Sequence, residues 1–145
     1  MATGSRVDPY RGFNFRVEID GITQAGFQEA GGLDASTAAV DYREGTDHRT
    51  RKLPGLPTFS PITLKRGITD STDLYDWAKT AQEGKVQRKN GSIVLCDETG
   101  AEKIRWNFTE AWPSKWTGPS FSAGTATVAV ESLEIVHEDL QRALR

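Results

Sequence analysis

The side chains that most often carry out chemistry are scarce in this chain, which has one cysteine and two histidines among 145 residues. Cys96 lies in an apolar segment without a histidine beside it, so we expect a small buried side chain and not an activated thiolate. Neither His48 nor His137 has a second histidine at metal-ligand spacing, and we expect both to be structural. The sequence therefore predicts no catalytic residue and no metal ligand.

Phosphate-binding loops and nucleophile motifs are missing from the sequence as well. It contains no GxGxxG, and Gly84-Lys85 is followed by Val86 instead of the serine or threonine that completes a Walker A loop. The segment GPSFSAG, which begins at Gly118, does not match the nucleophile elbow of hydrolases. We therefore expect a protein that is not an enzyme and binds no cofactor.

Length and composition indicate a single domain over residues 1–145, since 37% hydrophobic and 26% charged residues are typical of a globular domain. A chain of this size can bury a core without disulfides or metals. No apolar run has the length of a signal peptide or the roughly 18 residues of a membrane helix. We therefore expect synthesis and folding in a cytoplasm, with no membrane segment.

Several segments alternate apolar and polar residues with the period of a half-buried strand. They are residues 13–20, 37–42, 62–65, 103–108 and 125–137. Asn90-Gly91 opens a further strand from Ser92 to Cys96, and the turn from Asp97 to Gly100 joins this strand to residues 103–108 in a hairpin. The last segment changes phase at Ser132-Leu133, which predicts a β-bulge at that point.

One helix is predicted, from about Thr72 to Glu83, with Asp70 or Ser71 capping its first turn and Gly84 ending it. Its apolar stripe consists of Leu74, Trp77, Ala78 and Ala81. Such a stripe should pack on the outside of a sheet. Several strands and a single helix predict a mainly β fold, which is an antiparallel barrel or sandwich. Assembly with other copies of the chain would cover its edge strands.

The segment from Tyr42 to Ile68 links two predicted strands, is basic and contains Pro54 and Pro57. We predict a long loop here, at about residues 43–60. Structureless connections longer than about 12 to 15 residues are usually functional or disordered, and the aliphatic residues in this one argue against disorder. The loop is therefore predicted to contact another protein.

Tryptophans beside basic residues leave one other class of function open. Aromatic platforms next to cations stack on single-stranded nucleic acid. The residues in question are Trp106, Trp112 and Trp116, which lie near Lys103, Arg105 and Lys115. The net charge of −2 argues against binding through phosphates. Trp106 is in the apolar phase of its strand and is expected in the core, whereas Trp112 and Trp116 stay undecided.

Several motifs, in this order along nearly the whole chain, give the sequence a resemblance to a known family. They are GFNFRVEIDGI, AGGLDAS, YREG, RKLPGLPTFSPITLKRGIT followed by DLYDW, and VAVESLEIVHE. With these motifs the chain resembles the inner tail tube proteins of contractile phage tails and of phage-derived contractile injection systems.

This resemblance implies a structural subunit of six-membered rings that stack into a hollow tube. Sheets of neighbouring subunits would join around the lumen, with helices outside. The implied partners are other copies of the chain, a surrounding sheath protein, baseplate, spike and terminator proteins, and a cargo effector or DNA in the lumen. Assembly would take place in the bacterial cytoplasm. A single-ring adaptor between tube and baseplate would share the motifs, and a small nucleic-acid-binding β-barrel is the third alternative.

Within this family frame the predicted loop is a candidate for self-assembly. Arg43, Arg49, Arg51 and Lys52 could pair with carboxylates of another subunit, and Leu53 and Leu56 could supply apolar anchors. The alternative is a loop folded back over its own domain. The polar phase of two strands is expected to face the lumen, at Lys103, Arg105, Asn107, Thr125 and Thr127.

Overall fold

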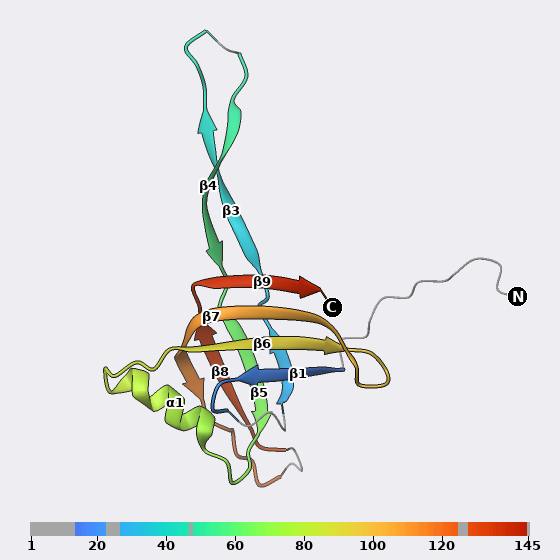
Figure 1. The fold of residues 1–145 in the computed structure, drawn as a ribbon. Helices are drawn as coiled ribbons and strands as arrows, with labels where there is room; N and C mark the ends of the chain where they lie inside the picture. The colour runs from blue at the N-terminus through green and yellow to red at the C-terminus, as the bar shows by residue number, and fades with distance from the viewer. Residues whose placement is uncertain (1–13, 23–26, 47, 125–127, 145) are drawn as a thin grey trace, which may run out of the picture.

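The computed structural model describes residues 14–22, 27–46, 48–124 and 128–144 of the chain. These ranges contain nine strands and one helix, and every strand pairing is antiparallel (Figure 1). In chain order they are β1 (Phe15–Ile19), β2 (Phe27–Gly31), β3 (Ala35–Tyr42), β4 (Arg51–Phe59), β5 (Ile62–Gly67), α1 (Asp73–Gln82), β6 (Lys89–Cys96), β7 (Glu102–Thr117), β8 (Val130–Val136) and β9 (Asp139–Leu144). The prediction of a mainly β fold with one helix is confirmed.

Seven strands form one sheet in the order β1-β6-β7-β8-β5-β2, with β9 also paired to β7. The sheet bends along β7, because the first half of this strand pairs with β6 and β9 and its second half pairs with β8. Glu110 lies between the two halves at φ 54, and its backbone N–H donates to the side-chain oxygen of Asn90 at 3.0 Å. The bend divides the body into two layers, β1-β6-β7-β9 and β2-β5-β8-β7.

The core fills the space between these layers and the helix. It consists of Val17, Ile19, Ile22, Ile62, Leu64, Leu74, Trp77, Ala78, Ile93, Phe108, Ala111, Leu133 and Ile135. The register explains these positions, since Val17 and Ile93 lie opposite each other and Leu64 lies opposite Leu133. Directly opposed residues of antiparallel strands share one face, so the alternation in the sequence becomes one apolar interior.

The helix begins at Asp73, and its N-cap residue is Thr72 and not Asp70 or Ser71. The Thr72 hydroxyl caps no backbone amide and donates to the Asp76 carboxylate at 3.0 Å. The Asp73 carboxylate accepts a hydrogen bond from the Leu74 N–H at 2.8 Å. The predicted end is confirmed, because Gly84 adopts φ 76 just beyond the last turn. The apolar stripe is buried at Leu74, Trp77 and Ala78, and α1 lies against β7.

The bulge predicted at Ser132-Leu133 is wrong, since β8 pairs with β5 without a register shift from Val130 to Ile135. The inward phase of β8 contains a charged residue, Glu131, which is 3% exposed. Because only apolar residues were expected to point inward, the buried Glu131 made the alternation along β8 appear to change phase. A register shift does occur beside β8, on β7 between Pro113 and Lys115.

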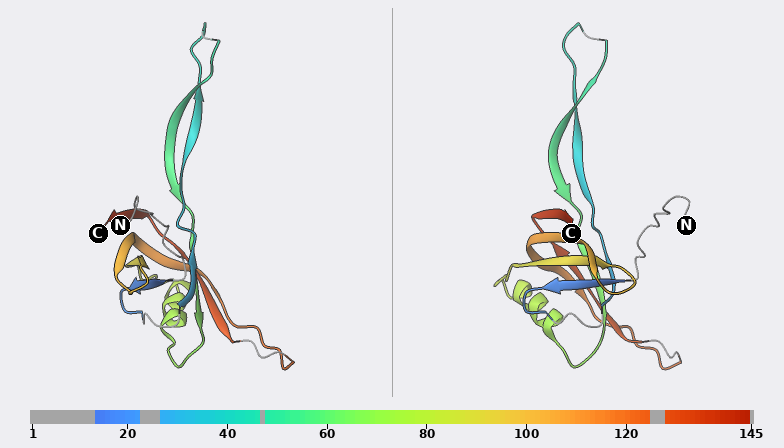
Figure 2. Two further views of the ribbon diagram at one scale, coloured as in Figure 1. Left: turned by 90° about the vertical axis from the view of Figure 1, so that its right-hand side faces the viewer. Right: turned by 45° about the vertical axis from the view of Figure 1, so that its right-hand side comes forward.

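Part of the loop predicted at residues 43–60 is also wrong, because residues 51–59 form strand β4 and pair with β3. The prolines in β4 argued for a loop, since proline cannot donate to a ladder. They are tolerated because β3 and β4 form a separate two-stranded sheet, in which each strand is an edge. The chain therefore builds a long β-hairpin that projects from the body (Figure 2).

Candidate assembly surfaces

The β3–β4 hairpin leaves the body where β2 ends and β5 begins, and its pairing runs from Ala35 opposite Phe59 to Tyr42 opposite Arg51. Its base is tied to the body through Phe59, whose ring lies 5.5 Å from that of His137. Every residue of β3 is exposed, and in β4 only Gly55 and Phe59 are partly covered. Beyond its base, the hairpin stands clear of the body (Figure 1).

Apolar side chains on the hairpin are open to solvent, and they carry the case for an interface. The exposed fraction is 49% at Val40, 46% at Leu53, 44% at Tyr42 and 82% at Leu56. Val40 and Leu53 lie opposite each other, so they form one continuous apolar strip. A two-stranded hairpin alone is marginally stable in water. The arrangement is typical of a segment that another protein surface covers.

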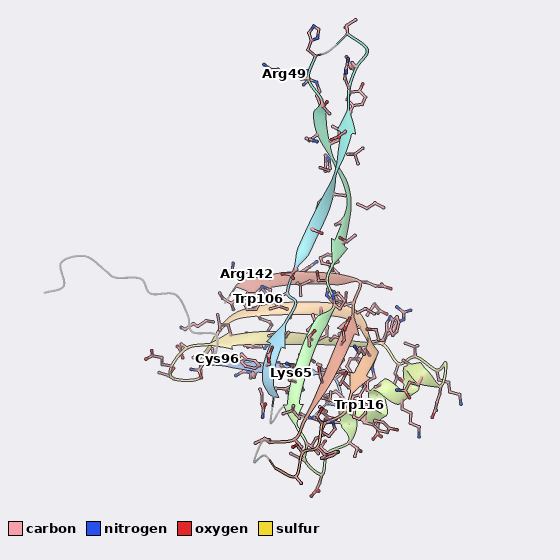
Figure 3. All side chains as sticks on the ribbon, turned by 180° about the vertical axis from the view of Figure 1, so that it is seen from behind. Arg49, Lys65, Cys96, Trp106, Trp116 and Arg142 are labelled. Carbon is pink, nitrogen blue, oxygen red and sulfur yellow. The ribbon has the colours of Figure 1, made fainter. Side chains whose placement is uncertain are left out.

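Charged residues surround this strip toward the hairpin tip. Lys52 pairs with Asp41 across the two strands, and the Tyr42 hydroxyl donates to Glu44 at 3.1 Å. Arg49 and Arg51 each interact with another residue of the chain. Arg49 lies near the tip, far from the body (Figure 3). The hairpin thus brings together the predicted assembly residues Arg43, Arg49, Arg51, Lys52, Leu53 and Leu56 on one projection.

The layer β1-β6-β7-β9 carries a network of charges on its outer face. Arg105 pairs with Glu18 at 3.0 Å and with Glu102 at 2.6 Å. Arg16 pairs with the same two carboxylates, at 2.8 and 3.1 Å. Hydrogen bonds from Arg16 and then from Arg105 lower the pKa of Glu18, whereas those to Glu102 and Glu18 raise the pKa of Arg105. The network balances two positive and two negative charges.

The other residues predicted to face the lumen also have partners within the chain. Asn107 accepts a hydrogen bond from the Ser92 hydroxyl at 2.6 Å, and Lys103 lies 3.6 Å from the carboxylate of Asp97. Thr125 and Thr127 lie outside the described residues. The face around Arg105 is therefore polar, but its described charges are largely satisfied internally.

The layer β2-β5-β8-β7 presents a second polar face, which the sequence analysis did not single out. Lys65 lies opposite Ser132, and Thr63 lies opposite Glu134. The Lys65 ammonium lies 3.4 Å from Glu29, and both side chains are well exposed. The alternation of Thr63 and Lys65 with buried Ile62 and Leu64 is the signal that marks this face in the sequence.

Behind this second face lies a buried cluster of charges that sequence reasoning missed. Arg66 is 1% exposed, pairs with Glu131 at 3.0 Å and also pairs with Asp73 at the start of α1. The Trp116 indole donates to the other oxygen of Glu131 at 3.1 Å, and Phe27 lies under the guanidinium at 5.5 Å. The cluster joins β2, β5, β7, β8 and α1, so it fixes the helix against the sheet.

Trp106 and Trp116 lie in different environments. Trp116 is partly buried and packs against the core, with Tyr75 edge-on to it at 5.0 Å. Trp106 was expected in the core, but it is only partly buried and packs beside Arg142 at 5.9 Å (Figure 3). Its strand neighbour Phe108 takes the buried position instead, at 1% exposure. No continuous aromatic platform results among these residues.

Other chemistry finds little support in the part of the chain that the structure describes. There, no group of three or more His, Cys, Asp or Glu side chains could hold a metal ion. Cys96 is buried and unpaired. Within the same ranges, none of the helical structure is long and apolar enough to span a membrane.

The comparison with known families identifies the family of this chain. Residues 11–141 match the model of the family described as T4-like virus tail tube protein gp19. The chain belongs to the tail tube protein family. Members of this family are structural tail tube proteins and not enzymes.

Solved structures from contractile injection systems share the fold of this tail tube protein. A chain of the PVC sheath-tube complex in its extended state is 29% identical, with a TM-score of 0.85 over 94% of this chain and 93% of that one. A chain of the anti-feeding prophage cap is 28% identical, with a TM-score of 0.88 over 99% and 97%. A chain of the 6-fold symmetrised anti-feeding prophage baseplate, at 22% identity and 0.84 over 95% and 97%, shows the fold alone.

One curated protein also matches part of the tail tube protein, the Zn(2)-C6 fungal-type transcription factor FTF1a of Fusarium oxysporum f. sp. lycopersici. The two are 39% identical over 66 residues, which are 43% of this chain. The chain spans only 6% of that protein's length. A zinc cluster of that class needs several cysteines and this chain has one, so its zinc chemistry does not carry over.

Proposed function

We propose that this tail tube protein forms rings of six copies, which stack into a hollow tube inside a contractile sheath. The proposal depends above all on the exposed apolar strip of the β3–β4 hairpin, because a projection of this kind gains stability only against another surface. The tube is a component of a phage tail or of a tail-like injection particle. A single tail-tube domain over residues 1–145 supplies both the ring body and the hairpin.

Ring closure and stacking multiply weak contacts. An exposed ion pair contributes about 1 kcal/mol or less. Each copy repeats it around a closed ring, and each added ring repeats it again. Arg43, Arg49, Arg51 and Lys52 therefore need only modest pair energies, while Leu53 and Leu56 supply the apolar contacts.

Two polar faces of the body are candidates for the lumen wall. The face with Lys103, Arg105 and Asn107 follows from the sequence pattern, and Thr125 and Thr127 belong to the same assignment. Strand direction favours the other face, with Thr63 and Lys65. In Figure 1, β5 and β8 run roughly along the hairpin, whereas β1, β6 and β9 cross it. If the hairpin points along the tube axis, only strands near that direction match the tilt of about 35 to 45° found in barrels.

Labelling introduced cysteines in assembled particles distinguishes the two faces, since the natural cysteine, Cys96, is buried. Lys65→Cys and Arg105→Cys differ in the face that they probe, and Val86→Cys on the exposed connection after α1 is the control. A lumen position reacts with a small maleimide but not with one attached to a large polymer. We expect this pattern at Lys65. The same pattern at Arg105 alone would mean that the face with Arg105 lines the lumen.

The proposed partners are the other components of a contractile particle. A sheath protein surrounds the tube, baseplate and spike proteins close one end, and a terminator closes the other. A cargo effector or DNA passes through the lumen. A passage that must release its cargo should bind it weakly, and balanced pairs such as Lys65 with Glu29 meet that need. Assembly takes place in the bacterial cytoplasm.

Two other functions give different results in one experiment. Negative-stain images and native mass spectra of the purified protein should contain six-copy rings and stacked tubes. An adaptor between tube and baseplate would form rings that do not stack. A nucleic-acid-binding barrel would stay monomeric and bind single strands with strong salt dependence. The internal pairing of Arg16 and Arg105 argues against the last function, because phosphate binding needs available cations.

A further inference from the structure

A groove lies on the body between α1 and the second half of β7. The residues that form its two walls are Ala78, Ala81 and Gln82 of the helix and Trp112, Lys115 and Trp116 of the strand. The small alanine side chains leave its space open. Its volume is about 180 Å³, which is below the roughly 300 to 1,000 Å³ of small-molecule sites. The groove therefore fits a side chain of a polypeptide better than a small-molecule ligand.

Trp112 is the tryptophan beside this groove whose role the fold does not explain. It is partly buried, yet it is not among the side chains that form the core or pack against it. The Trp116 indole N–H donates to Glu131 within the chain. The Trp112 indole N–H has no hydrogen-bond partner among the described residues. Because a buried indole N–H usually has a partner, Trp112 offers the groove both an apolar face and a donor.

Lys115 adds a positive charge at the rim of the groove. Its side chain is exposed and forms no ion pair with a described residue, although Glu134 lies opposite it on β8. Grooves that are lined by aromatic side chains bind proline-containing segments, whose restricted backbone lowers the entropy lost on binding. The lysine favours a segment that also carries a carboxylate.

One segment of this chain has that chemistry, and it lies outside the described residues. Residues 7–10 read Val-Asp-Pro-Tyr. Of the six prolines in the sequence, only Pro9 follows an acidic residue, which is Asp8. Tyr10 adds an aromatic ring, and aromatic side chains often anchor contacts between proteins. Residues 8–10 therefore match the groove in charge and in apolar character.

The start of β1 lies on the side of the body away from the groove. There the Cys96 N–H donates to the Asn14 carbonyl at 2.8 Å. Cys96 and Trp116 lie on opposite sides of the body (Figure 3). The eight residues of β6 separate the two sides, a length of about 23 Å. From Asn14 back to Asp8 the chain spans about 20 Å at most, so Asp8 does not reach the groove of its own copy.

We propose that residues 8–10 bind in the groove of a neighbouring copy in the same ring. Pro9 and Tyr10 pack on Trp112, whose indole N–H donates to a main-chain carbonyl of the segment. The Asp8 carboxylate pairs with the Lys115 ammonium. The inference rests on the proposed function and adds a contact within each ring. Since the segment starts on one side of the body and the groove lies on the other, the contact is heterologous and is repeated around a closed ring.

Disulfide cross-linking tests this contact. Asp8→Cys with Lys115→Cys places two thiols at the proposed ion pair, and the natural Cys96 is buried. Asp8→Cys with Val86→Cys, at an exposed residue after α1, is the matched control. After mild oxidation, denaturing gels without reductant should show a ladder of linked chains that ends at six copies for the first variant. The control should show single chains.

Charge reversal gives a second readout of the same contact. Asp8→Lys alone or Lys115→Asp alone places like charges together at every joint of the ring. Each should lower the fraction of protein in rings about fivefold at low salt, as measured by native mass spectrometry. Lys115 is exposed, so its replacement should not disturb folding. The double variant, in which the two charges are exchanged, should restore the rings.

Other results overturn the inference in distinguishable ways. Rings without a ladder from the Asp8→Cys, Lys115→Cys variant would show that the segment does not bind the groove, while the proposed function would stand. Cross-linked single chains that migrate faster would show that each copy covers its own groove. A ladder that continues beyond six copies would place the contact between rings. An unchanged protein that forms no rings at all would overturn the proposed function itself.

Discussion

The body and the hairpin of this protein are stabilised in opposite ways. In the body, Ile62, Leu64, Leu133 and Ile135 are fully buried, and the helix is fixed by a buried charge cluster. In the hairpin, β3 is exposed along its whole length. We therefore propose that the body can fold alone, whereas the hairpin is stabilised by surfaces outside the chain. On this proposal the buried residues of the body serve folding and the exposed apolar residues of the hairpin serve assembly.

The largest effect on folding should come from Glu131→Met, which leaves Arg66 buried with half of its pairing. Breaking a buried ion pair by removing one partner costs about 3 to 5 kcal/mol. Urea denaturation should show this loss in the free energy of unfolding. Glu134→Met, on the outward phase of the same strand, is the control and should change it by less than about 0.5 kcal/mol. An equal effect of both would show that the cluster does not stabilise the body.

A smaller loss is expected where the hairpin joins the body. Gly32 has φ 88, and a Cβ there would lie 2.2 Å from the Pro61 carbonyl oxygen. Gly32→Ala should therefore cost about 2 kcal/mol or more, since strained backbone alone costs about 1 to 3. Gly45→Ala near the hairpin tip has open space and should be neutral in thermal unfolding. A neutral Gly32→Ala would mean that the junction can shift freely.

Acidification should remove a still smaller contribution from the body. Hydrogen bonds from Arg16 and Arg105 lower the pKa of Glu18 in the folded protein. Its contribution is therefore complete above the unfolded value of about 4.3 and is lost as the pH falls through the folded pKa. The difference in unfolding free energy between the unchanged protein and Glu18→Gln should be about 1 kcal/mol or less at pH 6. It should shrink toward zero near pH 3, and a difference that grows on acidification would contradict the assignment.

The smallest effect on folding should come from the hairpin itself. Val40→Ser with Leu53→Ser removes the apolar strip, but both side chains are about half exposed and neither is among those that form the core or pack against it. The free energy of unfolding of the ring-free protein should change by less than about 0.5 kcal/mol, while tube length in electron micrographs should fall sharply. A large loss of stability with normal tubes would contradict this expectation, because the hairpin would then serve folding and not assembly.

Sequence patterns predicted the body better than the hairpin. Alternation located β1 and β5, in each of which one face is buried, and it also located the first half of β7 and most of β3, although every residue of β3 is exposed. It failed for β4, where both faces are exposed and prolines replace ladder donors. It also missed β2 and β9, whose short segments gain their strand structure from pairing with β5 and β7. Periodicity therefore identifies strands whose polar and apolar residues alternate regularly, and it gives no signal where prolines or short segments interrupt that alternation.

The candidate site shows the same division. The residues Arg43 to Leu56 stood out by composition, and they do lie on one projection. The cluster around Arg66 did not stand out, since its members Glu131, Asp73 and Trp116 are brought together only by the fold. Pairing between distant segments cannot be read from one sequence.

The central claim is that the body is stable alone and that the hairpin is stabilised by neighbouring copies. Hydrogen exchange of the hairpin and body amides, measured on unassembled protein and on tubes, tests it most directly. We expect the amides of β5, β6 and β8 to be protected in both samples, and those of β3 and β4 only in tubes. Equal protection of the hairpin before and after assembly would contradict the claim.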